Sequence, residues 1–280
     1  MSTTHAVGLR IADVALTVSG PEYVTARLAA AWSSFVAPVE GLRIDVLQCG
    51  AANTMPRAPS ALRDHDRLVL RDGALMELRL DLHAAHAHVR LWSHAADDRR
   101  SGLPMGLHNA LSSLLATLLA RAGGMLLHAS SVQLTSGDAV LFLGPSGAGK
   151  STIAAMFPRD AVLNDELVAV RPAGTSWRVH STPLSGTLEL LPLRTSAPLA
   201  AALVLEKAED ITASLLSPRD ALRALLPAIA LPQGDEEGEM TAFDFASRLV
   251  RERPFLRLRF SRDATAVRLG VERAVQEVGR

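Results

Sequence analysis

Several residue types that mark a special environment are scarce in this sequence. It has a single cysteine, Cys49, so no disulfide can form within the chain. Thiol catalysis depends on a neighbouring base, and the sequence shows none beside Cys49, so we expect a structural cysteine in a reducing cytosol. Aromatic residues make up only 4% of the chain and give no indication of chemistry.

Neither sign of charge prevails, and long hydrophobic runs are missing. The 29 basic and 29 acidic residues give a formal net charge of +0, so no overall field favours nucleic acid or an anionic membrane. The first residues lack the basic start and long apolar segment of a signal peptide. The most apolar stretch, residues 111–120, is too short to cross a bilayer. We therefore expect a cytoplasmic protein with no nucleic-acid or membrane partner.

Enough apolar residues are present to bury a sizeable core. Hydrophobic residues make up 48% of the 280, which suffices for one large domain or two small ones. Hydrophobic periodicity predicts helices at 21–32 and 105–122 and strands at 8–17, 42–48, 67–71, 74–82 and 86–93. A soft boundary near residue 103 then separates an N-terminal α+β region with a β-meander, residues 1–103, from residues 104–280.

Two of the predicted strands carry a polar face. In residues 74–82, Glu77 and its alternate neighbours are predicted to face solvent, opposite a row of apolar side chains. His86 and His88 share one face of the next strand, but no cysteine or acid joins them at ligand spacing. We therefore predict that these histidines, together with His83 and His94, belong to a polar outer face and bind no metal.

The most informative motif follows a short apolar run at residues 139–143. That run is typical of a buried strand. Residues 144–151, GPSGAGKS, match G-x-x-x-x-G-K-[ST] at every fixed position, and residues 152–157 continue as a helix that ends before Pro158. A strand before this motif and a helix after it define the context of a phosphate-binding loop. The predicted nucleotide contacts are Gly144, Ser146, Gly147, Ala148, Gly149, Lys150, Ser151 and Thr152.

Each part of the loop has a physical task. The glycines allow a tight turn whose N–H groups point inward as an anion cradle, and the helix start adds its positive dipole end. Lys150 is predicted to neutralise the β- and γ-phosphate oxygens of ATP. The hydroxyl of Ser151 is predicted to ligate Mg²⁺. The loop alone predicts phosphate binding and no particular reaction.

Two flanking segments supply candidate reactive groups. If residues 125–134 pair antiparallel with residues 139–143 around the turn at 135–138, Leu134 lies opposite Ala139 and His128 falls at the mouth of the loop. Downstream, Asp165 and Glu166 follow an apolar run only fifteen residues after Lys150. Carboxylates there can hold Mg²⁺ and take a proton from an attacking hydroxyl.

The remaining features are weaker or architectural. Residues 181–187 are small and turn-forming and suggest a loop near the site, and Arg194 is a candidate cation for the γ-phosphate. The acidic run 235–239 is predicted to be a solvated loop. Ser217 followed by Pro218 predicts the start of a helix, residues 254–260 alternate as a strand, and a last helix follows Asp263.

Taken together, these segments resemble a known family. Residues 126–130 (LLHAS), the loop 144–151 and residues 163–166 (LNDE) are similar to the C-terminal domain of HPr serine kinase/phosphorylase, which shares its core with ATP-dependent phosphoenolpyruvate carboxykinase. Residues 181–187, 216–226 and 249–260 further resemble HPr-kinase-like proteins of peptide-modification gene clusters, including lasso peptide precursor kinases. The resemblance covers residues 103–280.

The resemblance implies a fold and a set of roles. The fold would be α/β, a P-loop mixed-sheet kinase core with the N-terminal α+β region added. Asp165 matches the general base toward a serine hydroxyl, Glu166 stands beside the metal where relatives often carry a second aspartate, and His128 matches a histidine near the transferred phosphate. The chain departs from the full HPr kinases in Glu166 itself and in lacking their glycine- and asparagine-containing motif after the acidic turn.

We therefore predict an ATP- and Mg²⁺-dependent kinase that acts on a serine hydroxyl. A lasso-precursor-like peptide is favoured over HPr as the acceptor, and a homo-oligomer is possible. The catalytic residues would be Asp165, His128 and Lys150, and the metal ligands Ser151, Asp165 and Glu166. The alternatives are a small-molecule kinase, a non-catalytic nucleotide-binding regulator and a transporter-type or switch ATPase, although the acids here come too soon after the loop for the last.

Overall fold

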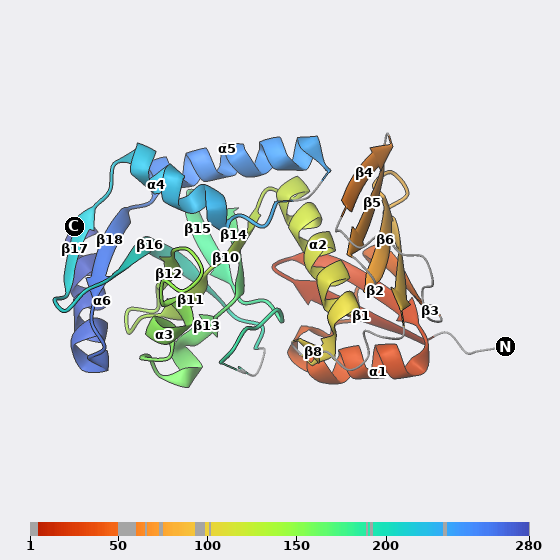
Figure 1. Ribbon diagram of the computed structural model, residues 1–280, viewed down its shortest axis with the longest axis horizontal. Helices are drawn as coiled ribbons and strands as arrows, with labels where there is room; N and C mark the ends of the chain where they lie inside the picture. Colours follow the sequence, from red (N-terminus) through yellow and green to blue (C-terminus); the bar gives the residue numbers. More distant parts are fainter. Residues whose placement is uncertain are drawn as a thin grey trace. The chain divides into compact units, whose positions relative to one another are not determined.

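The computed structural model describes residues 5–49, 60–64, 66–72, 75–92, 99–100, 102–188, 190, 193–231 and 234–279. The chain forms two compact units, whose elements are labelled in Figure 1. Unit 1 comprises residues 1–122 and 231–239, and unit 2 comprises residues 123–230 and 240–280. The predicted division at residues 103 and 104 stays a prediction; the compact units separate after Ala122, at the end of a helix.

A seven-stranded mixed sheet in the order β1-β2-β3-β7-β6-β5-β4 forms the framework of unit 1. Strand β3 pairs in parallel with β2 and β7, and the other pairs are antiparallel. The strands are β1 His5–Ile11, β2 Val14–Gly20, β3 Leu42–Cys49, β4 Ser60–Asp64, β5 Arg67–Asp72, β6 Met76–Asp81 and β7 His86–Trp92. A separate two-stranded ribbon joins β8 Arg99–Arg100 to β9 Leu103–Pro104.

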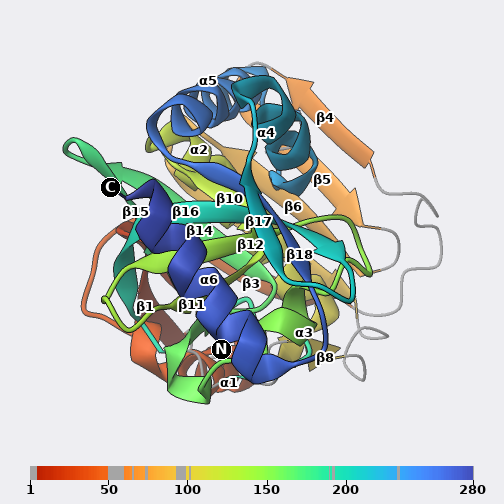
Figure 2. The ribbon, with the colours of Figure 1, turned by 90° about the vertical axis from the view of Figure 1, so that its left-hand side faces the viewer.

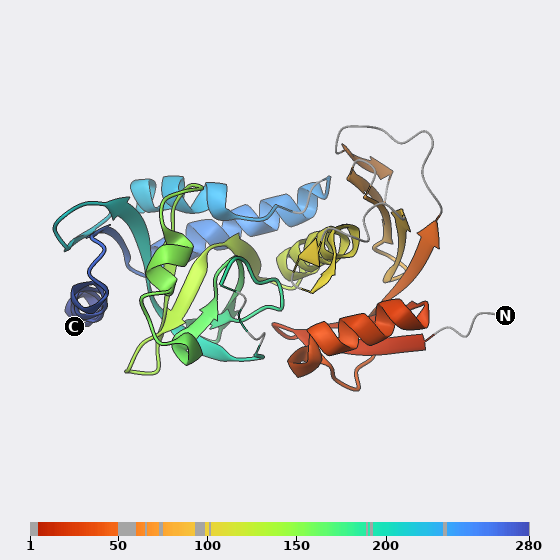
Figure 3. The same cartoon turned by 60° about the horizontal axis from the view of Figure 1, so that its bottom comes forward.

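Two helices cover the apolar side of this sheet. Helix α1, Glu22–Ala31, contacts β1 and β2 and runs along them in Figure 3. Helix α2, Met105–Arg121, contacts β2, β6 and β7. A short 3-10 turn, η1 at Ser33–Phe35, buries Phe35 completely. The predicted alternation in β6 and β7 is confirmed for Met76, Leu78, Leu80, Ala87, Val89 and Leu91, which are all buried.

The single strand predicted at residues 8–17 is wrong. The segment is a hairpin in which Ile11 pairs with Val14, and its two turn residues, Ala12 and Asp13, have φ of 46° and 66°. A two-residue turn with both φ values positive normally carries glycine or asparagine. Alanine gives no such signal in a sequence, and Asp13 by itself did not suffice to divide the predicted strand.

Glu77 also departs from its predicted exposure. It lies on the polar face of β6, yet it is 5% exposed. Arg71 and Arg79 each donate a hydrogen bond to its carboxylate at 2.8 Å, and Arg90 approaches within 3.8 Å. Burial alone would raise the pKa of Glu77, but the two hydrogen-bonded guanidinium groups hold it below its ordinary value. The long arginine side chains cover a residue that the alternation assigned to solvent.

Unit 2 contains a nine-stranded mixed sheet. Its main path is β10-β14-β15-β16-β12-β11-β13, with β18 beside β16 and β17 beside β18. Only the pairs β12–β16 and β16–β18 are parallel. The strands are β10 Met125–His128, β11 Ser130–Gln133, β12 Ala139–Leu143, β13 Val162–Asn164, β14 Leu167–Ala173, β15 Ser176–His180, β16 Ser196–Lys207, β17 Thr212–Leu215 and β18 Phe255–Phe260.

The core of unit 2 fixes the strand that leads to the glycine-rich segment. All five residues of β12 are buried, as predicted. On one side of the sheet, Val140 and Phe142 pack with Ile153 of α3, Lys150–Ala154, and with Val267 and Val271 of α6. Helix α6, Ala264–Val278, crosses in front of these strands in Figure 2, and Asp263 caps it as predicted. The unit is thus a mixed α/β structure in which strand β12 is buried along its whole length.

Helix α4, Pro218–Leu225, is capped by Ser217, as the sequence predicts. Two short 3-10 turns are also present, η3 at Arg159–Ala161 and η4 at Leu226–Ala228. None of the helices within the described residues is long and apolar enough to cross a membrane.

The acidic run at 235–239 is not a solvated loop. It begins helix α5, Glu236–Glu252, and Asp235 is 0% exposed. Arg121 donates two hydrogen bonds of 2.8 Å to the Asp235 carboxylate, and Arg63 donates a third at 3.4 Å. A buried acid is tolerated when it is paired and hydrogen-bonded in this way. Asp235, the first residue of the run, is therefore a buried carboxylate of unit 1 that two arginines remote in sequence stabilise.

Candidate phosphate-transfer site

The glycine-rich segment connects β12 to α3, and its backbone requires glycine. Gly147 and Gly149 have φ of 79° and 102°, in the left-handed region that side-chain-bearing residues rarely adopt. A Cβ atom on Gly149 would also lie 2.8 Å from the ring of Phe260, whereas one on Gly147 would meet nothing within 4 Å. The loop is therefore tightly packed where it joins α3 and open at its tip.

Solvent reaches the tip of this loop and little of its base. Pro145, Ser146 and Gly147 are exposed, whereas Gly144, Ala148 and Gly149 are partly buried. Lys150 is buried at 8% exposure, and Thr152 is exposed on the short helix. An exposed turn above a buried ammonium group is a suitable shape for an anion that approaches from solvent.

Lys150 reaches back beneath the loop that precedes it. Its Nζ donates hydrogen bonds to the carbonyl oxygens of Gly144 at 2.9 Å and Pro145 at 3.3 Å. Burial lowers the pKa of Lys150, because a desolvated ammonium is less stable, and the nearby negative charge of Glu166 raises it in part. The site therefore holds a cation whose charge would be stabilised by a bound anion.

The acidic turn lies beside the start of α3. The Ser151 hydroxyl is 3.5 Å from the backbone carbonyl oxygen of Asp165, at the turn between β13 and β14. Asn164, which is 1% exposed, shapes this turn: its Oδ1 accepts from the N–H groups of Glu166 at 2.7 Å and Leu167 at 3.1 Å. Its amide donates to the carbonyl oxygen of Thr182 at 2.9 Å. Asn164 thus joins the acidic turn to the segment after β15.

Asp165 is held more tightly than its predicted role suggests. The residue is 1% exposed, and both carboxylate oxygens accept backbone hydrogen bonds, from Gly186 at 2.7 Å and Leu188 at 2.8 Å. These contacts confirm that the segment after residue 180 lies near the acidic turn. Gly186 was missed as a site residue, although the small-residue composition of 181–187 pointed to this loop. Its hydrogen, in place of a side chain, leaves room for both carboxylates.

His128 reaches the site by a different pairing from the predicted one. Strand β11 pairs Gln133 with Ala139, one residue away from the expected register. The predicted continuous strand 125–134 is interrupted at Ala129, and His128 belongs to β10, where it pairs with Leu167 of β14. The register argument was therefore wrong because it extended one ladder across a break between two strands.

The correct pairing nevertheless brings His128 to the acidic turn. Its Nε2 lies 3.5 Å from Oε1 of Glu166, with the His128 side chain 48% and the Glu166 side chain 19% exposed. Glu166 also contributes charge to Lys150. Glu166 therefore lies beside His128 and within electrostatic reach of Lys150, with the Ser151 hydroxyl across the same turn. Arg194 is exposed, and no contact of the described residues joins it to this group.

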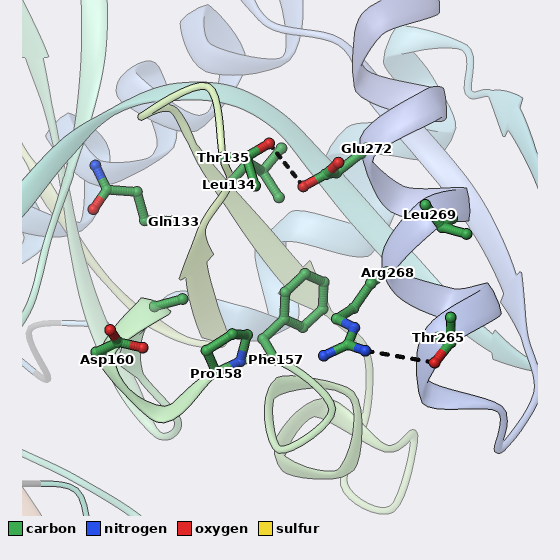
Figure 4. A pocket seen from close by; sticks show the side chains of 11 residues that line it. Gln133, Leu134, Thr135, Phe157, Pro158, Asp160, Thr265, Arg268, Leu269 and Glu272 are labelled. Atoms are coloured by element: carbon green, nitrogen blue, oxygen red, sulfur yellow. Dashed lines mark hydrogen bonds between the residues drawn. The ribbon is translucent and has the colours of Figure 1, made fainter.

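A cavity of unit 2 lies elsewhere. It has a volume of about 610 Å³, and Figure 4 shows Arg268 of α6 beside Phe157 and Glu272 of α6 beside Thr135 in its wall. Thr135 donates a hydrogen bond of 3.0 Å to Glu272 at its edge. None of the predicted site residues lines this cavity. The reactive groups are gathered at the loop, on the other end of α3.

Comparisons with known proteins give distant structural similarities and no match of sequence or family. No protein-family model matches the chain, and no curated protein matches its sequence. Among solved structures, the HPr(Ser) kinase/phosphatase from Coxiella burnetii is similar at 9% identity and a TM-score of 0.32, over 55% of this chain and 95% of that one. A similarity at this identity and TM-score assigns no family and no site, so the function has to be inferred from the residues at the loop.

Proposed function

We propose that this chain is a magnesium-dependent phosphotransferase with a P-loop core that moves the terminal phosphate of ATP to a hydroxyl group. The observation that carries the proposal is the buried Lys150 beneath an exposed glycine loop, with Glu166 and His128 beside it. Burial destabilises the charged form of Lys150, and an anionic ligand above it would offset this cost. A polyphosphate fits the spacing of the motif.

The oxygen donors beside the loop fit Mg²⁺. Ser151 offers a hydroxyl and Glu166 a partly exposed carboxylate, which are the hard ligands that this ion prefers. Asp165 would take part through the lone pairs that its two backbone hydrogen bonds leave, or through a bridging water. Bound there, Mg²⁺ would neutralise charge on the phosphates.

The chain's own groups account for the transfer step. The acceptor oxygen forms a bond to the γ-phosphorus while the bond from that phosphorus to the β–γ bridging oxygen breaks, and ADP leaves. The acceptor proton passes to a carboxylate. Asp165 is the base expected from the family resemblance, whereas Glu166 is the more accessible carboxylate and has His128 as a neighbour. Lys150 stabilises the charge on the departing oxygens.

The acceptor class rests on the resemblance of residues 126–130, 144–151 and 163–166 to HPr serine kinase/phosphorylase, and of residues 181–187, 216–226 and 249–260 to HPr-kinase-like proteins of peptide-modification clusters. We propose a serine of a peptide or protein, with a lasso-precursor-like peptide favoured over HPr. The second candidate function is a non-catalytic nucleotide-binding regulator. It is favoured by one observation, namely that the Asp165 carboxylate is buried and already accepts two backbone hydrogen bonds.

Two conservative variants separate these functions. Asp165→Asn and Glu166→Gln remove one negative charge each while keeping side-chain size, and Asp160→Asn, an exposed acid away from the loop, is the matched control. Binding of Mg·ATP is measured by calorimetry, and transfer to serine-containing peptides is measured by mass spectrometry. We expect the variant that lacks the base to transfer phosphate about 100-fold or more slowly than the unchanged protein and to keep its affinity for ATP.

The outcomes are distinct. A large loss confined to Glu166→Gln would assign the base to Glu166, and one confined to Asp165→Asn would assign it to Asp165. If the unchanged protein binds ATP but transfers phosphate to no peptide, protein or small acceptor, the regulator function replaces the kinase. If it binds no triphosphate at all, both functions are excluded.

A further inference from the structure

The polar face of the unit 1 sheet brings together two histidines and an aspartate. His86 and His88 are alternate residues of β7, so their side chains share a face, and their ring centroids are 4.3 Å apart. Asp45 belongs to β3, which pairs with β7 in parallel and sets Asp45 opposite His88. One ligand atom from each of the three lies within 4.8 Å of the other two.

This grouping overturns the argument that spoke against a metal. The sequence offers no acid at ligand spacing from His86 and His88 because Asp45 precedes them by some forty residues. The parallel pairing of β3 with β7, which a sequence pattern does not reveal, supplies the missing carboxylate. The histidines do lie on the polar face that was predicted for them, and Asp45 lies beside them on that face.

Each oxygen of the Asp45 carboxylate takes part in a hydrogen bond, and a metal ion would take the place of the one between Asp45 and His86. Arg43 donates to Oδ1 at 3.3 Å, and His86 Nε2 lies 2.8 Å from Oδ2. An outer hydrogen bond that orients a metal-binding carboxylate is usual in protein metal sites.

Arg43 bonds to Asp45 itself, whereas three other cations on the same face are engaged with other acids. Arg79, which pairs with His88 across β6 and β7, donates to Glu77 at 2.8 Å. Arg90 also approaches Glu77, at 3.8 Å, and Arg67 donates to Asp81 at 3.4 Å. These three guanidinium groups are thus paired with carboxylates other than Asp45.

We propose that Asp45, His86 and His88 form a binding site for a divalent transition-metal ion, Zn²⁺ foremost. Two imidazoles and one carboxylate are a common ligand set for Zn²⁺, whereas Mg²⁺ and Ca²⁺ prefer oxygen donors alone. Tetrahedral geometry at Zn–ligand distances of about 2.0–2.2 Å requires ligand atoms about 3.3 Å apart. The His86–Asp45 pair thus has to open by roughly half an ångström, and the proton between them is displaced.

The site would keep one coordination position open. Three protein ligands leave the fourth tetrahedral position to water or to a group from a binding partner. His88 is exposed and the other two ligands are partly buried, so solvent has access to that position. The proposal concerns unit 1 and is independent of the proposed phosphotransfer at the loop of unit 2.

Cobalt provides a direct spectroscopic test. The full chain, without nucleotide, is titrated with Co²⁺ and then with Zn²⁺, while visible absorption and calorimetry follow binding. We expect the intense absorption of a four-coordinate Co²⁺ site, its loss on addition of one equivalent of Zn²⁺, and at least a tenfold weaker Zn²⁺ affinity in His86→Ala, His88→Ala and Asp45→Asn. His83→Ala removes a histidine outside the cluster and is expected to bind Zn²⁺ normally.

Two further measurements keep the outcome decisive. Circular dichroism of each variant without metal shows whether the sheet is intact, and Asp165→Asn serves as a second control for binding at the loop. The proposal is overturned if the unchanged protein binds no Zn²⁺. It is also overturned if His83→Ala weakens binding as much as His86→Ala does, or if only the loop variant weakens it, because the cluster would then be an ion pair within a polar face.

Discussion

At the scale of single residues, Lys150 offers the sharpest test of the loop. Replacement by methionine keeps the length and volume of the buried side chain but removes the ammonium group that bonds to Gly144 and Pro145. We expect Lys150→Met to weaken ATP binding at least tenfold, which corresponds to about 1.4 kcal/mol, because the phosphates would lose their buried cation. Calorimetry measures the affinity, and circular dichroism checks the fold.

The matched control for this change is Arg268→Met, which removes a cation from the wall of the cavity in Figure 4. It is expected to leave the affinity for ATP unchanged. The opposite result, in which Arg268→Met weakens binding and Lys150→Met does not, would move the nucleotide from the loop to that cavity.

The lowered pKa of Lys150 leads to a second residue-scale prediction. A bound triphosphate would raise this pKa again, so binding should take up a proton at pH values between the pKa of the free protein and that of the complex. Affinity should accordingly fall as pH rises through the pKa of the free protein, which lies below the ordinary value of about 10.4. Calorimetry in two buffers of different ionisation enthalpy measures the proton uptake.

Lys150→Arg gives the control, because a guanidinium stays charged throughout this range. We expect the variant to bind with no proton uptake and with a flat dependence on pH. Equal proton uptake by the variant and the unchanged protein would assign the titration to another group.

At the scale of elements, short-range sequence patterns predicted single strands and helix caps, but they did not predict which strands pair. The strand β12, the start of α4 at Ser217 and the cap of α6 at Asp263 follow from short-range patterns and are confirmed. The break at Ala129 and the turn at Ala12 and Asp13 contain no glycine or proline, so neither was recognised within the longer predicted strand. Of the site, the sequence could predict which residues carry chemistry, but not that Gly186 and Leu188 hold Asp165, because that contact depends on how distant strands meet.

The segment after β15 supports an element-scale prediction. A Cβ atom on Gly186 would lie 3.0 Å from Oδ2 of Asp165 and 2.8 Å from Oε2 of Glu166. Because backbone bonds fix Asp165, we expect Gly186→Ala to displace the segment or Glu166, and to slow phosphotransfer at least tenfold. The free energy of unfolding should fall by only about 1–3 kcal/mol. Peptide phosphorylation and denaturant unfolding measure the two effects.

Gly279→Ala is the corresponding control, because an added Cβ there meets nothing closer than 3.4 Å and lies at the end of α6. It should change neither quantity. If Gly186→Ala transferred phosphate at the normal rate, the position of the acidic turn would not limit the reaction.

At the scale of the whole molecule, each unit depends on contacts between residues that are remote in sequence. In unit 1 the clearest is the ion pair between the buried Asp235 and Arg121, which are 114 residues apart in the sequence. Most of the residues between them belong to unit 2. No local pattern reveals such a contact, and the acidic neighbours of Asp235 conceal it. The same reasoning applies to Asp45 and His86, so two of the features of unit 1 that were misjudged from the sequence are carboxylates whose partners are remote in sequence.

The ion pair between Asp235 and Arg121 should make the stability of unit 1 depend on pH. Burial would raise the pKa of Asp235, but Arg121 holds it below its ordinary value. The pair therefore stabilises the fold above the pKa of about 3.9 that the residue has when unfolded, and this stability is lost as pH falls through the lowered pKa. Asp235→Asn should cost about 2–3 kcal/mol at pH 7, at the lower end for a broken buried pair because Arg121 keeps some exposure to water.

Hydrogen exchange can assign this loss to unit 1. We expect amides in β6 and β7 to lose protection in Asp235→Asn at pH 7, and the difference from the unchanged protein to shrink when stability is measured by denaturant unfolding at progressively lower pH. Glu236→Gln removes an equal charge from an exposed neighbour and should change stability by no more than about 0.5 kcal/mol. A deficit in Asp235→Asn that stays constant down to pH 2 would mean that lost packing, and not the ion pair, accounts for it.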